Sequence, residues 1–197
     1  MSATLARQNL FDFFENRVQS VRDDQGAALS QDVVRYLAWL LSSLGKTEAL
    51  FRNQQPETLA EMHMRSLTLQ NEPQALGHYK HIGDFALYIG GYFSDSLHRK
   101  TVGLSYYAEM GGAAYHRAAG ISQEVAGGLS SLHTLFSEMA SRFPICLGVL
   151  TEVAERDRTE QLSDLAGLFE RWLTTRDPHT GRRLAKLGVL PAQPIDD

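Results

Sequence analysis

Residues 73–97, PQALGHYKHIGDFALYIGGYFSDSL, decide the fold class. Side chains with apolar or aromatic groups recur here at steps of four and three, at His78, Ile82, Phe85, Ile89 and Tyr92. This spacing places them along one side of an α-helix, because a helix completes a turn every 3.6 residues. Pro73 suits the first turn, where a backbone N–H has no intrahelical partner. The pattern predicts a helix from Pro73 to about Leu97.

The same rhythm recurs on both sides of this stretch. On the amino-terminal side it predicts helices over about 3–22, over about 31–44 after an N-cap at Ser30, and over about 56–69 with Pro56 in the first turn. On the carboxyl-terminal side it predicts helices over about 101–120, from Ser122 onward with a break or kink at Pro144, across the stripe 162–172, and over about 179–187.

No run of alternating β-branched residues is bounded by turn signals, so a sheet is not expected. Seven or eight amphipathic helices joined by short links predict an all-α fold, either a compact multi-helix bundle or an orthogonal helical array. A chain of 197 residues is within the size range of one domain. We expect one helical domain over 1–190, followed by a C-terminal tail over 191–197.

Charge, apolar runs and cysteine content indicate which partners and locations are expected for this protein. The formal net charge is −4, and the basic residues are scattered along the chain, so nucleic acid is not an expected partner. The longest apolar runs fall short of the ~20 residues that a membrane-spanning helix needs, so no transmembrane segment is expected. The first residues lack the pattern of a signal peptide, which predicts a cytoplasmic location. Cys146 is the single cysteine, and its apolar neighbours indicate a buried, unreactive thiol.

Sequence motifs of catalysis are missing. The chain has no Gly-x-Ser-x-Gly, no Gly-x-Gly-x-x-Gly and no P-loop pattern, so hydrolase elbows, dinucleotide sites and phosphate loops are not indicated. We therefore predict no catalytic residue and no particular cofactor, and the sequence leaves open whether the protein is an enzyme.

Three Gly-Gly pairs lie in the predicted helices, at 90–91, 111–112 and 127–128. Glycine inside a helix costs up to ~1 kcal/mol relative to alanine, so something should compensate. The favoured interpretation is close helix crossing. The alternative is a site for a small apolar ligand or cofactor between helices, lined by Tyr88, Gly91, Tyr92, Gly112 and Tyr115.

Histidines and carboxylates suggest a second kind of site. His78, His81 and Asp84 follow one another at one-turn steps, and Glu109 and His116 are two turns apart. Helical bundles build metal sites from such groups on neighbouring helices. The Glu-x-x-His and His-Glu-x-x-His spacings of known helical metal sites are absent, however. Metal binding by these five residues is therefore an alternative hypothesis beside ordinary structural roles.

Several segments carry a resemblance: GDFALYI at 83–89, GYFSDSL at 91–97, MGGAAY at 110–115 and, near the C-terminus, ERWL at 170–173. Over about the last two thirds of the chain, the sequence resembles a group of uncharacterised bacterial all-helical proteins. The resemblance implies a helical fold and no assigned activity.

Two functional hypotheses follow. The first is a non-catalytic interaction or regulatory protein that acts through a protein partner or as a homo-oligomer, because no complete catalytic set exists. The second is a helical bundle that binds a metal or small apolar ligand between its glycine-bearing helices, with redox activity as an extension of this hypothesis. The sequence does not identify the ligand, partner, oligomeric state or pathway.

Overall fold

The computed structural model describes residues 2–44, 58–69, 71–94, 103–125 and 131–189. These residues form α-helices and one short π-helical segment and contain no strand, which confirms the predicted all-α class. The α-helices are α1 (Ser2–Gln25), α2 (Gln31–Leu44), α4 (Leu59–Ser66), α5 (Glu72–Leu87), α6 (Leu104–Val125), α7 (Ser131–Ser141), α8 (Phe143–Thr175) and α9 (Pro178–Lys186). The π-helical segment, Tyr88–Tyr92, directly continues α5.

The chain divides into two compact units, residues 1–154 and 155–197. The boundary falls inside α8, which runs without interruption from Phe143 to Thr175. The predicted single domain over 1–190 stays a prediction.

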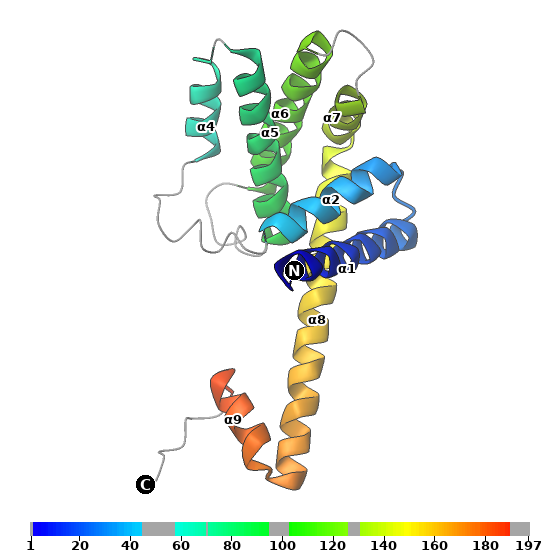
Figure 1. The fold of residues 1–197 in the computed structure, drawn as a ribbon, viewed down its shortest axis with the longest axis vertical. Helices are drawn as coiled ribbons and strands as arrows, with labels where there is room; N and C mark the ends of the chain where they lie inside the picture. The colour runs from blue at the N-terminus through cyan, green and yellow to red at the C-terminus, as the bar shows by residue number, and fades with distance from the viewer. Residues whose placement is uncertain (1, 45–57, 70, 95–102, 126–130, 190–197) are drawn as a thin grey trace. The chain divides into compact units, whose positions relative to one another are not determined.

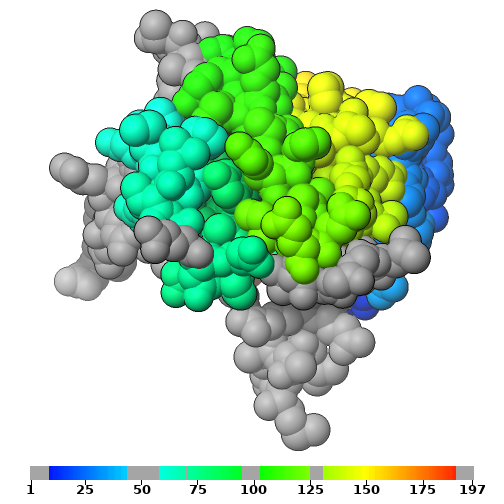
Figure 2. Space-filling view, turned by 90° about the horizontal axis from the view of Figure 1, so that it is seen from above, coloured from blue at the N-terminus to red at the C-terminus, as the bar shows by residue number. Residues whose placement is uncertain are grey.

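In the first unit, neighbouring helices pair in chain order. Helix α4 packs against α5, α5 against α6, α6 against α7, and α1 against α2, while α2 also contacts α7. Figure 1 shows α4, α5, α6 and α7 running alongside one another, with α1 and α2 crossing their direction. Seen from above, α4, α5, α6 and α7 follow one another across one face (Figure 2). The crossing directions correspond to an orthogonal helical array, which is one of the two arrangements that the sequence predicts.

The buried side of α5 differs from the predicted stripe. Ile82 is fully buried as predicted, but His78, Phe85, Ile89 and Tyr92 are only half-buried. The buried positions of the helix include Ala75, Tyr79, Gly83, Ala86 and Leu87. Helix α5 is enclosed by α4 and α6, and its small residues let these helices approach. Glycine and alanine contribute little to a hydrophobic pattern. The sequence pattern therefore does not identify the face of α5 that carries these small residues as the buried face.

Helix starts follow capping chemistry. The Ser30 hydroxyl accepts the N–H of Val33 at 3.3 Å, which confirms the predicted N-cap of α2. Helix α4 begins at Leu59, after a capping box in which Thr58 and Glu61 bond each other's backbone N–H. The predicted start at Pro56 lies outside the described residues. Pro73 lies in the first turn of α5, as predicted.

Two predicted boundaries are wrong. Helix α6 continues to Val125, so it neither ends at Gly120 nor gives way to a new helix at Ser122. The hydroxyl of Ser122 donates to the carbonyl of Ala119 at 2.8 Å. Serine satisfied in this way can remain inside a helix. Pro144 lies in the first turn of α8, after a turn at Arg142, where proline is well tolerated.

The second unit is a helical hairpin. It consists of residues 155–175 of α8 and the short helix α9. Arg176 in the connection has a φ of 51°, and Asp177 caps α9 by accepting the N–H groups of His179 and Thr180. The predicted helix over about 179–187 is thereby confirmed.

Candidate functional site

A carboxylate joins three helices in the first unit. Asp84 on α5 accepts a hydrogen bond from the Tyr36 hydroxyl of α2 at 2.6 Å and one from the Tyr115 hydroxyl of α6 at 2.7 Å, both at Oδ1. Its Oδ2 is 2.6 Å from Nζ of Lys80, one turn earlier on α5. The side chain of Asp84 is only 11% exposed. We call Asp84, Tyr36, Tyr115 and Lys80 the Asp84 cluster. Its three charge-assisted hydrogen bonds offset the desolvation cost of the buried carboxylate.

A glycine makes this geometry possible. A Cβ at position 83 would lie 2.7 Å from Cζ of Tyr115. The fully buried Tyr115 ring therefore passes directly over the backbone of α5, and its hydroxyl reaches the next residue, Asp84. The Tyr115 ring is also stacked with the ring of Phe136, at a centroid distance of 5.7 Å and an interplanar angle of 13°.

The two phenols remain protonated over a wide pH range. Burial raises the pKa of Tyr115 well above its ordinary value, and the negative charge of Asp84 raises it further. The pKa of Tyr36 is raised for the same reasons in the same order. Both phenols therefore act as hydrogen-bond donors to Asp84, and neither is activated as a nucleophile.

Lys80 connects the Asp84 cluster to a partly exposed aromatic pair. Its Nζ lies 4.5 Å from the ring centroid of Trp39 and 5.3 Å from that of Tyr36. The two rings are 5.5 Å apart and inclined by 41°. Both distances are within the range of a cation–π contact. The ammonium group is thus held by one carboxylate and two aromatic rings.

The residues of the predicted ligand site are in close contact with protein side chains. A Cβ on Gly91 would lie 2.8 Å from Cβ of Leu150, and Tyr88 stacks on Tyr92 with an interplanar angle of 7°. Tyr115 belongs to the Asp84 cluster. Gly112 has only ordinary contacts, the nearest at 3.6 Å. Close helix packing therefore explains Gly91, and the small-ligand site stays a prediction. The pair 127–128 lies outside the described residues.

The structure does not bring the five residues of the predicted metal site together. Nε2 of His78 lies 3.0 Å from the carbonyl oxygen of Met62, while His81, Glu109 and His116 are exposed. Asp84 is bonded within its own cluster. Among the described residues, no group of three or more histidine, cysteine, aspartate or glutamate side chains could hold a metal ion. The geometry gives the metal hypothesis no support.

Cys146 is fully buried, as its apolar neighbours predict. Burial raises the pKa of its thiol to about 12, with a smaller contribution from Glu138. The thiolate that nucleophilic chemistry needs is therefore scarce at neutral pH.

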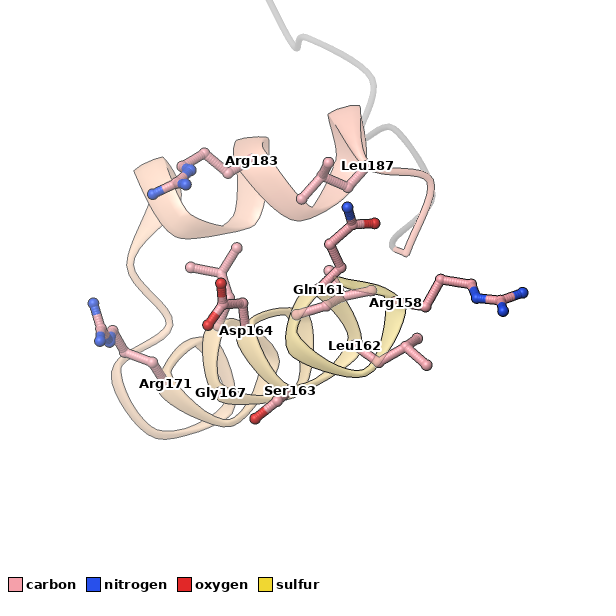
Figure 3. Close-up of a pocket in the computed structure, with 11 residues that line it drawn as sticks. Arg158, Gln161, Leu162, Ser163, Asp164, Gly167, Arg171, Arg183 and Leu187 are labelled. Carbon is pink, nitrogen blue, oxygen red and sulfur yellow. The ribbon is translucent and has the colours of Figure 1, made fainter. Parts of the chain in front are cut away.

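A groove lies between the two helices of the second unit. It encloses about 870 Å³, and it is open to solvent along the hairpin (Figure 3). Its apolar lining comes mainly from leucines, at Leu162, Leu165, Leu168 and Leu187. Leu162 and Leu187 are 66% and 61% exposed. The hairpin therefore leaves much of its apolar surface in water.

The charges along this groove are mostly basic. Arg158, Arg171 and Arg183 line it, together with the carboxylate of Asp164. Figure 3 shows Arg171 of α8 and Arg183 of α9 at the same end of the groove, Asp164 nearer its middle and Arg158 at the other end. Neither Arg171 nor Arg183 forms a salt bridge with a residue that the structure describes.

Sequence reasoning missed most of these residues. The spacing of Lys80 and Asp84 is a local signal, since residues four apart share a helix face. Tyr36 and Trp39 lie more than 40 positions away from Lys80 in the sequence, and nothing local indicates that they meet it. The groove arginines look like ordinary surface charges until α9 folds back along α8.

Comparisons with models of protein families, with curated proteins and with solved structures gave no significant match. The structure therefore defines the protein by class alone, as an all-α multi-helix protein. Within the described part of the chain, no helix combines the length and apolar character needed to cross a bilayer.

Proposed function

We propose that this protein is a non-catalytic interaction protein whose C-terminal hairpin binds a helix of a partner protein. The observation that carries the proposal is the open, leucine-lined groove between α8 and α9. The described residues of the hairpin include only three buried side chains, Asp157, Thr180 and Leu184, and only Leu184 among them is both apolar and fully buried. A two-helix unit with so little interior gains stability when a third element covers its apolar side.

The charge of the groove indicates what this element carries. Three arginines and one aspartate line it, so its local formal charge is +2. A partner helix with a leucine stripe flanked by acidic residues would bury the apolar lining and pair with the arginines. A second copy of the chain would bring an equally basic groove against the first, which like charges disfavour.

The test uses two synthetic amphipathic peptides that share one leucine stripe. One has glutamate at the flanking positions and the other has lysine. Trp172 packs against Gly181 of α9, so its fluorescence reports on the hairpin once Trp39 is replaced by phenylalanine. We expect the acidic peptide to bind at least tenfold more tightly than the basic one, and we expect added salt to weaken its binding.

Charge reversal supplies a matched control. Arg171→Glu with Arg183→Glu should abolish the preference for the acidic peptide. Arg182→Glu should leave it unchanged, because Arg182 is exposed on the same helix but does not line the groove. Equal binding of both peptides by the parent, or an effect of Arg182→Glu as large as that of the Arg171→Glu, Arg183→Glu double variant, would contradict the proposal. The molar mass of the protein is also measured in the absence of peptide. If this mass doubles as the protein concentration rises, and Leu162→Asp prevents the doubling, the groove binds a second copy of the chain instead.

The proposal retains the predicted cytoplasmic location and protein partner. Imaging of a fluorescent fusion in the native host would test the location independently of the peptide experiment.

A further inference from the structure

The contacts of Lys80 have the composition of a site that recognises an ammonium ion. Nζ lies 2.6 Å from Oδ2 of Asp84 and within 5.3 Å of the centroids of two rings, Trp39 and Tyr36. A carboxylate combined with inclined aromatic faces is how proteins bind methylated ammonium groups. Here the ammonium group in the site belongs to the chain itself.

The site borders on solvent. Trp39 is 44% exposed and the side chain of Lys80 is 31% exposed, so both side chains of this contact are partly open to solution. The opposite side is fixed, because the hydroxyls of Tyr36 and Tyr115 hold Asp84 in place. Asp84 and the ring of Tyr36, which also packs against Phe136, are therefore held without the help of the Lys80 ammonium group.

We propose that Trp39, Tyr36 and Asp84 form a binding site for a methylated ammonium group, and that Lys80 is its displaceable internal occupant. The tether gives Lys80 a high effective concentration, of millimolar order or above. The site is therefore closed to weak ligands while Lys80 is charged and in place. Neutralising Lys80 opens it. This proposal is independent of the hairpin groove, because all of its residues lie in the first unit.

The experiment removes the occupant and supplies a replacement. Lys80→Met keeps most of the apolar stem and deletes the charge. In a Trp172→Phe background, Trp39 is the remaining tryptophan, and its fluorescence reports on the site. Choline is titrated at constant ionic strength, beside 3,3-dimethylbutan-1-ol, which has the same shape without the charge. We expect choline to bind Lys80→Met at least tenfold more tightly than it binds the parent, and the neutral analogue to bind neither.

Two controls separate recognition from a general change of the protein. Lys186→Met removes an exposed lysine of α9 and should leave choline binding as weak as in the parent. Adding Asp84→Asn to Lys80→Met should weaken choline binding at least tenfold while the far-ultraviolet circular dichroism stays helical. Equal titrations of the parent and Lys80→Met, or equal responses to choline and its neutral analogue, would overturn the proposal.

Discussion

The Tyr115 ring lies so close to Gly83 that a Cβ at position 83 would approach its Cζ to 2.7 Å. The ring is fully buried, and its hydroxyl donates a hydrogen bond to Asp84. Both constraints oppose the shift of the ring that an added Cβ would require. We expect Gly83→Ala to lower the free energy of unfolding by about 1–2 kcal/mol, since overpacking outweighs the better helix propensity of alanine.

Gly77 offers a matched control on the same helix. It is exposed, and a Cβ there would meet nothing within 4 Å. Gly77→Ala should raise the free energy of unfolding by about 0.5–1 kcal/mol through helix propensity alone. Urea unfolding followed by circular dichroism measures both variants. Stabilisation by both substitutions would show that Tyr115 does not pack on Gly83 as described.

The second prediction concerns the bond between Tyr115 and Asp84. Tyr115→Phe removes a donor to a buried carboxylate, and a hydrogen bond to a charged group is worth about 1.5–3 kcal/mol. Asp84→Ala should cost more, because it leaves two phenolic hydroxyls without their acceptor. Tyr107→Phe is the control, since its hydroxyl forms no hydrogen bond with a described residue. It should change the free energy of unfolding by less than about 0.5 kcal/mol.

A double-mutant cycle distinguishes a direct bond from general loosening. If the bond is direct, Tyr115→Phe should cost much less in an Asp84→Ala background, which has no acceptor at this position, than in the parent. Additive losses of stability would contradict the Asp84 cluster.

The third prediction is a loss of stability at alkaline pH. The pKa of Cys146 is raised to about 12 in the folded protein, whereas an unfolded thiol ionises near pH 8.5. Above that pH the folded state binds more protons than the unfolded state, so the free energy of unfolding falls by about 1.4 kcal/mol per pH unit. Tyr36 and Tyr115, whose folded pKa values are also raised, add to this slope above about pH 10.

Urea unfolding between pH 8 and 11 tests the order of these losses. Cys146→Ala should flatten the curve between pH 9 and 10 and leave the steeper part above pH 10. Tyr115→Phe should reduce that steeper part. A free energy of unfolding that stays constant from pH 8 to 11 would mean that these groups titrate normally in the folded protein.

The helices were predictable because their apolar periodicity is local. Ser30 and Pro73 also signal helix starts by chemistry confined to a few neighbours. The failures at Gly120 and Ser122 have the opposite cause. Both residues have weak or ambiguous propensities, and their helical state depends on packing of α6 against α5 and α7. Propensity is a weak guide where tertiary contacts decide.

The candidate sites were less accessible to sequence reasoning. The sequence does point to Asp84 and Tyr115, but it predicts them as ligands of a metal and of a small molecule. In the structure they form a hydrogen bond between two helices, although the two residues are 31 positions apart in the sequence. No sequence pattern along either helix predicts this bond. Tyr36 completes the cluster from 48 positions away. Such sites depend on which helix faces are brought together.

The last prediction tests whether helix α9 must be formed for the groove to bind its partner. Helix α9 has nine residues, a length at which an isolated helix is marginal. The Asp177 carboxylate accepts the N–H of Thr180 at 2.9 Å and its hydroxyl at 2.7 Å. These bonds lower the pKa of Asp177, so the cap is present at neutral pH and is lost as pH falls below the ordinary range of an aspartate.

Asp177→Ala should therefore destabilise α9, because it removes the N-cap, and it should weaken binding of the acidic peptide, although Asp177 does not line the groove. Asp177→Ser should restore most of both, because serine also caps helices. Hydrogen exchange would show faster exchange in α9 of Asp177→Ala and unchanged exchange in the first unit. If Asp177→Ala accelerates exchange in α9 but binds the acidic peptide as tightly as the parent, then α9 does not form one wall of the binding groove.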